Sequence, residues 1–193
     1  QQQYVYCTTP DGYFGGIWMS GGGPSADENG NIYVGVGNGS VGKNGNVSDL
    51  RNRSESALKL TPDLNISSFF TPNNYETLEG ADLDFGVTQV MLIPNTDRAI
   101  VGVKDGKLFL LDRNNLGGYS AGPDNVVQTI NLGGNAFLRS SMSYYKGVSG
   151  EYVYSWSENA LLKAFPYNRT TGMFDLGSTI SSGIQGPTGN NGA

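Results

Sequence analysis

The feature that most constrains the fold is a β-rich pattern that occurs three times along the chain. Each occurrence has a run rich in Val, Ile and Tyr, a turn, a second apolar run, another turn and a closing β-rich run. The opening runs are residues 31–38, 98–105 and 151–158, and the second runs are residues 57–60, 108–112 and 161–165. Units of this kind bury their faces by stacking on one another, so the pattern predicts a repeat architecture.

Further strand candidates complete each unit. Those that precede the opening runs are residues 16–20, 87–93 and 137–144, and the closing ones are residues 66–70, 126–130 and 173–176. Asn29-Gly30 and Asp105-Gly106 fall where hairpin turns are needed. The interval between the second and third units is close to the roughly 40–50 residues of a propeller blade. We therefore expect an all-β fold, a β-propeller segment of about three four-stranded antiparallel blades that belongs to a larger ring.

The repeat divides the chain into one partial propeller with five parts. Residues 3–7 are followed by Thr9-Pro10, as the closing run of the first unit is followed by Thr71-Pro72, so we expect residues 1–10 to be the last strand of a preceding blade. Residues 181–193 are rich in Gly, Ser and Asn and are expected to be a linker to a further blade. The remaining blades would come from the same or another chain. The three blades are expected at residues 11–73, 74–132 and 133–180.

Composition supports short strands and excludes several classes of function. Gly accounts for 29 of the 193 residues, about twice its average share of roughly 7%. The net charge is −5 and no basic run occurs, so we expect no nucleic-acid partner. No apolar stretch is long enough to predict a membrane span. His is absent and Cys7 is the only cysteine, which excludes a Ser-His-Asp triad, a Cys-His pair and a His/Cys zinc site within this chain.

Three stretches of the chain resemble one protein family. Residues 15–33 combine a Gly-Gly-Ile-Trp start, a Gly-Gly-Gly-Pro turn and an Asn-Gly-Asn-Ile-Tyr end, and residues 81–86 and 105–118 continue the likeness. Together they resemble the secreted, mostly bacterial pyrroloquinoline-quinone-like (quinoprotein-like) β-propeller domains. The resemblance implies a propeller with more blades than this chain holds, and an extracellular or periplasmic location.

The resemblance also raises the question of cofactors. Quinoprotein dehydrogenases hold their quinone with two adjacent cysteines, a Trp platform and a calcium ion bound by Glu, Asn and Asp. This chain has one cysteine and no stretch that matches those ligands, so we do not expect this segment to bind the quinone. Calcium remains a candidate cofactor, because Asp82 and Asp84 could supply oxygen ligands. The alternative is that both carboxylates accept hydrogen bonds from loop N–H groups.

Two long connections carry the other candidate site residues. Residues 39–56 and 71–86 are expected on the same face of the propeller, where loops on a rigid scaffold often carry function. Charged residues of the first connection that could line a polar site are Asp49, Arg51, Arg53 and Glu55. Arg139 is expected either to point into the central channel or to pair with a buried carboxylate. The Asn residues of Asn-x-Ser/Thr sequences, candidates for glycosylation, are Asn38, Asn46, Asn52, Asn65 and Asn168.

Three functions remain open. The leading one is an extracellular, non-catalytic propeller scaffold or interaction module whose partners are proteins or glycans. The second is a segment of a quinone-dependent dehydrogenase whose active residues lie in blades outside this chain. The third is a carbohydrate-binding propeller in which Trp18 or Trp156 stacks on sugars. We assign no catalytic residue within this chain.

Overall fold

The computed structural model describes residues 2–133 and 136–188. The chain is predominantly β structure in antiparallel sheets, which confirms the all-β class. The described residues contain one short α-helix, α1 (Tyr75–Gly80), and two 3₁₀ turns, η1 (Phe85–Val87) and η2 (Leu176–Ser178). None of the described helices is long and apolar enough to cross a membrane.

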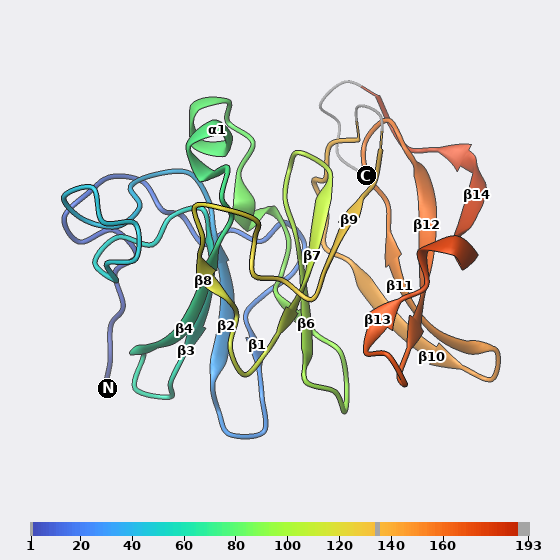
Figure 1. Cartoon of the computed structure of the whole chain (residues 1–193), viewed down its shortest axis with the longest axis horizontal. Helices are drawn as coiled ribbons and strands as arrows, with labels where there is room; N and C mark the ends of the chain where they lie inside the picture. Colours follow the sequence, from blue (N-terminus) through green and yellow to red (C-terminus); the bar gives the residue numbers. More distant parts are fainter. Residues whose placement is uncertain (1, 134–135, 189–193) are drawn as a thin grey trace.

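Three sheets follow one another along the chain, and each contains four strands that pair in chain order (Figure 1). The first sheet contains β1 (Ser25–Ala26), β2 (Ile32–Val36), β3 (Ser56–Leu60) and β4 (Ile66–Thr71). The second contains β5 (Met91–Leu92), β6 (Arg98–Gly102), β7 (Lys107–Asp112) and β9 (Gln128–Asn131). The third contains β10 (Ser143–Gly147), β11 (Gly150–Ser155), β12 (Leu161–Asn168) and β13 (Met173–Phe174). Over the described residues the sheets form an open row rather than a closed ring.

Two further strands extend these sheets. β8 (Gly118–Tyr119) comes from the connection between β7 and β9, yet it pairs in parallel with β4 of the first sheet. β14 (Ile180–Gln185) pairs antiparallel with β12. Residues 181–185 therefore belong to the third sheet, where we had expected a linker, and residues 189–193 lie outside the described part. The prediction missed β14 because main-chain hydrogen bonds can form an edge strand from Ser and Gly even where apolar and polar residues do not alternate.

The N-terminal side also differs from expectation. No strand forms at residues 2–10 or 16–20, and the innermost strand of the first sheet is the two-residue β1. Met19 lies beside β2 instead, and its sulfur accepts a hydrogen bond from the Gly35 N–H at 3.5 Å. Tyr6 packs against the apolar outer face of the first sheet. The N-terminal segment thus covers this sheet face with a side chain and does not pair with a strand.

Successive sheets pack face to face because alternate side chains of each strand point toward the neighbouring sheet. Between the first and second sheets, the rings of Phe70, Phe85 and Phe109 lie with centroids 5.0 to 6.4 Å apart. Between the second and third sheets, Leu110 and Phe165 belong to one buried cluster. Each pair of neighbouring sheets therefore shares a continuous apolar core.

The inner segments of the three sheets meet at one place. The Ser141 N–H donates to the Ser20 carbonyl at 3.1 Å, and the Ser141 hydroxyl accepts a hydrogen bond from the Gln89 N–H at 3.1 Å. A side chain at Gly22 would collide here, because its Cβ would lie 2.4 Å from the Ser141 Oγ. The inner edges of the three sheets thus converge on a common point.

Candidate functional site

The connections between the second and third strands of each sheet, and those between sheets, lie on one face of the molecule, at the top of Figure 1. We call this surface the loop face. Hydrogen bonds join its segments: Asn38 Nδ2 donates to Asp82 at 3.1 Å, and the Leu138 N–H donates to the Lys104 carbonyl at 3.3 Å. The two long connections singled out in the sequence therefore lie side by side.

Glu55 is a buried acid within the loop face. Its side chain is fully buried, and Oε2 accepts a hydrogen bond from the Phe85 N–H at 2.7 Å. Oε1 has no hydrogen-bond partner among the described residues. Burial raises the pKa of Glu55 to about 8, and the charge of Asp84 adds to the rise against the effect of the Phe85 N–H. Glu55 is therefore mostly protonated at neutral pH.

The candidate metal ligands Asp82 and Asp84 share a lysine. Lys104 Nζ donates to Asp82 at 2.9 Å and to Asp84 at 3.1 Å. Burial by itself lowers the pKa of Lys104, but the hydrogen bonds and charges of the two carboxylates outweigh it, so the pKa is raised. In residues 2–133 and 136–188 no group of three or more acidic, His or Cys side chains is placed to hold a metal ion. The ammonium group thus lies where a cation would have to bind.

Calcium is expected to leave the stability of the chain unchanged, because Lys104 already neutralises the two carboxylates. Differential scanning calorimetry measures the thermal midpoint with and without calcium. Millimolar calcium is used, because weak extracellular sites bind calcium in this range. Lys104→Met is the matched variant, since it removes the ammonium group and should make the thermal midpoint sensitive to calcium. A calcium-dependent rise of the midpoint in the parent chain would contradict this expectation.

Arg53 is fully buried at the base of the long connection between β2 and β3. Its guanidinium donates to Thr71 Oγ1 at 3.3 Å, to the Asn52 carbonyl at 2.8 Å and to the Val47 carbonyl. The guanidinium carbon lies 4.4 Å from the centre of the Phe69 ring. Burial lowers the pKa of Arg53 to about 10. Arg53 therefore fastens the connection to the first sheet and does not line a binding surface.

The other charged candidates lie closer to solvent. Arg51 Nη2 donates to Asp11 at 2.7 Å, and Asp49 accepts a hydrogen bond from the Arg51 backbone N–H at 2.8 Å. Arg139 precedes β10, and its Nε donates to the buried Glu158 at 2.7 Å. Of the two expected roles of Arg139, the structure therefore contains the pairing with a buried carboxylate.

Four exposed aromatic or apolar residues lie within six positions of one another near the N-terminus, and we call them the aromatic patch: Tyr13, Phe14, Ile17 and Trp18. Phe14 is 77% exposed and its φ is 56°, a left-handed conformation that bulky residues rarely adopt. The Tyr13 hydroxyl donates to Glu79 of α1 at 3.2 Å, which ties the patch to the loop face. Sequence reasoning misses Tyr13 and Phe14, because their Gly-rich surroundings carry no periodic signal and their exposure is visible only in the structure.

The candidate glycosylation residues differ in accessibility. The exposed ones are Asn46, Asn65 and Asn168, whereas Asn38 is half-buried. Asn52 is 4% exposed, and its Nδ2 donates to the Gly42 carbonyl at 2.7 Å. A glycan on Asn52 would break this buried hydrogen bond, so the folded chain does not present Asn52 for modification.

No family model matches the chain, and a search of curated proteins finds no match. The residues themselves do not fit pyrroloquinoline quinone. Cys7 is exposed on the N-terminal segment and has no adjacent cysteine with which to form a disulfide platform. Trp18 and Trp156 are 52% and 37% exposed, so neither forms the wall of an enclosed cofactor cavity.

Proposed function

We propose that the chain is a segment of a quinoprotein-like β-propeller in which each sheet is one blade. The proposal is supported by the pairing of four strands in chain order, by the face-to-face packing of successive sheets and by their converging inner edges. The outer face of the third sheet carries Tyr145 and Ile180, which are 60% and 57% exposed. A further blade, from the same or another chain, would pack on this face.

We also propose that this segment is a non-catalytic interaction module of an extracellular or periplasmic protein and that it binds its partner through the aromatic patch. The exposed ring of Phe14 is the observation that carries this proposal. The left-handed backbone of Phe14 costs on the order of 1 kcal/mol, and burial within the chain does not offset it. A strained apolar side chain held in water is best explained by contact with a partner.

The charges around the aromatic patch favour a basic protein partner. Glu76 and Glu79 of α1 and the exposed Asp82 lie on the same face, and the chain has a net charge of −5. Lys and Arg side chains bind aromatic faces and carboxylates together. We therefore infer that the partner presents basic side chains to this surface.

A peptide array tests this function directly. Lys- and Arg-rich peptides should bind the chain, and Trp18→Ala should weaken that binding about tenfold or more, as loss of an exposed aromatic contact does at interfaces. Tyr145→Ala is the matched control, because it removes a similarly exposed ring from the third sheet and should bind like the parent. Binding that Trp18→Ala leaves unchanged would overturn the proposal.

Two further assays separate the alternatives. Binding on a glycan array that Trp18→Ala abolishes, without binding to basic peptides, would favour a carbohydrate-binding propeller that uses the aromatic patch. Reduction of a dye by alcohols or sugars after addition of the quinone and calcium would favour a dehydrogenase segment. Neither outcome is expected, since the carboxylates beside the aromatic patch favour cations and the quinone ligands are not present in this chain.

Replacing Phe14 by glycine is expected to raise the free energy of unfolding by about 1 kcal/mol while weakening peptide binding. Glycine adopts the φ of 56° without strain, and the ring that is lost is 77% exposed. Phe14→Ala is the control, because it removes the ring but keeps a Cβ in the left-handed backbone. Urea unfolding gives the free energy of unfolding of both variants. If the Phe14→Gly chain were less stable than the Phe14→Ala chain, the backbone of Phe14 would not be strained.

A further inference from the structure

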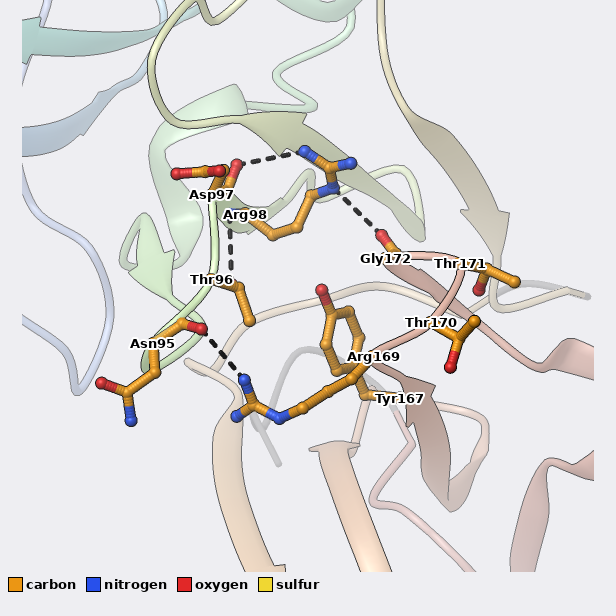
Figure 2. Close-up of a pocket in the computed structure, with 9 residues that line it drawn as sticks. All are labelled: Asn95, Thr96, Asp97, Arg98, Tyr167, Arg169, Thr170, Thr171 and Gly172. Atoms are coloured by element: carbon orange, nitrogen blue, oxygen red, sulfur yellow. Dashed lines mark hydrogen bonds between the residues drawn. The ribbon is translucent and has the colours of Figure 1, made fainter.

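A pocket of about 360 Å³ lies on the face opposite the loop face, between the second and third sheets (Figure 2). The β5–β6 turn forms one wall and the turn after β12 forms the other. Its volume lies within the usual range for small-molecule sites, at the lower end. Its lining residues are Asn95, Thr96, Asp97, Arg98, Tyr167, Arg169, Thr170, Thr171 and Gly172.

Two arginines hold the walls of this pocket in place. Arg169 donates to the Asn95 carbonyl at 3.0 Å and to the Pro94 carbonyl at 2.9 Å, across the gap between the two sheets. Arg98 Nε donates to the Gly172 carbonyl at 3.0 Å in the opposite direction. The two turns are thus fixed to each other by side chains, so the pocket is formed before any ligand binds.

Three hydrogen-bonding side chains that line the pocket have no partner among the described residues. Tyr167 is only 8% exposed, and its hydroxyl points toward the middle of the lining residues in Figure 2. Asn95 and Thr170 are exposed at the rim, and the Thr170 hydroxyl and the Asn95 side-chain amide make no hydrogen bond within the described part of the chain. The body of Tyr167 is buried while its hydroxyl opens into a polar hollow, so a ligand can take the place of water as its hydrogen-bond partner.

The charges around the pocket are balanced. Arg169 pairs with Glu151 at 2.7 Å, and Arg98 lies 3.9 Å from Asp112. The hydrogen bond from Arg169 lowers the pKa of Glu151 to about 2, so Glu151 stays ionised and is shared between Arg169 and the exposed Lys146, whose Nζ lies 2.9 Å from it. Asp97 adds a further carboxylate to the lining. The pocket therefore does not favour an anion, despite its two arginines.

We propose that this pocket binds a neutral, polyhydroxylated small molecule, a free monosaccharide or the terminal sugar of a glycan. Phenol, hydroxyl and amide groups each donate and accept hydrogen bonds, which matches the alternating donors and acceptors of a sugar ring. The pocket lies apart from the aromatic patch and shares no residue with it. The proposal is therefore independent of peptide binding on the loop face.

Titration of the ¹⁵N-labelled chain with free glucose, galactose, mannose and N-acetylglucosamine, followed by NMR, tests the proposal. At least one sugar should shift the amide signals of Asn95, Thr170 and Gly172 in a saturable way. A glycan array then distinguishes the two sources: array binding as well as free binding indicates a terminal sugar, and free binding alone indicates a small molecule. Shifts with sodium sulfate but with none of the sugars would overturn the proposal.

Tyr167→Phe is the decisive variant, because it removes only the unpartnered hydroxyl. It should weaken sugar binding about tenfold or more, as loss of a site's hydrogen bond to a substrate hydroxyl does, and leave the thermal midpoint unchanged. Tyr154→Phe, on the same sheet but outside the pocket, should bind sugar like the parent. Equal affinity of Tyr167→Phe and the parent chain would refute the assignment.

Discussion

Arg53→Ala is expected to lower the free energy of unfolding by about 3 kcal/mol, because it removes a fully buried side chain together with its charge-assisted hydrogen bonds. The substitution removes the hydrogen bonds to Thr71, to the Asn52 carbonyl and to the Val47 carbonyl, together with the contact over the Phe69 ring. The connection between β2 and β3 would then lose the side-chain hydrogen bond that joins it to Thr71 of β4. Urea unfolding followed by tryptophan fluorescence measures the loss.

Arg51→Ala is the matched control for this experiment. Arg51 lies two residues away in the same connection, but its side chain is 53% exposed and its ion pair with Asp11 is open to solvent. Exposed pairs of this kind contribute about 1 kcal/mol or less. Similar losses in the two variants would mean that the burial of Arg53 is not what stabilises the connection.

Glu55→Gln is expected to remove a loss of stability that the parent chain shows as the pH rises from about 4.5 to about 8. In the folded chain Glu55 has a pKa of about 8, against 4.5 for an exposed Glu. Between these two values the native state holds a proton that the unfolded state has released. The unfolding free energy should therefore fall as the pH rises through this window, by up to about 5 kcal/mol.

Gln keeps an oxygen for the Phe85 N–H and cannot ionise, so the variant should be the more stable chain at pH 8 and above. Glu76→Gln, on the exposed side of α1, is the control and should keep the pH dependence of the parent. Unfolding by urea at a series of pH values gives the comparison. A Glu55→Gln chain with the same pH dependence as the parent would show that Glu55 is already ionised at neutral pH.

The strands that sequence reasoning predicts well are those with long runs of Val, Ile, Leu and Tyr. β2 and β6 fall within their expected ranges, and β11 begins one residue before its range, because central strands need such side chains. β14 is missed, since an edge strand made of Ser and Gly depends on main-chain pairing alone. α1 is missed because six residues give less than two turns of helical periodicity.

The candidate site was predictable only in part. The sequence identifies Glu55 and Arg53 as charged residues of a long connection, but their burial depends on how that connection folds over the first sheet. The pocket around Tyr167 joins turns that are distant in the chain, as the hydrogen bond from Arg98 to Gly172 shows. No local pattern in the sequence carries such a contact, since it arises only when two sheets pack together.

The pairing of β8 with β4 has a consequence for how the molecule opens. The connection between β7 and β9 contains β8, which pairs with β4 of the first sheet. The second sheet therefore cannot unfold without breaking this pair and exposing the β4 edge of the first sheet. These two sheets therefore form one cooperative unit of local unfolding. The third sheet is joined to the second by its packed core and by side-chain hydrogen bonds such as those of Arg98 and Arg169. Among residues 2–133 and 136–188 no strand pair joins it to the second sheet, so partial unfolding should begin with the third sheet.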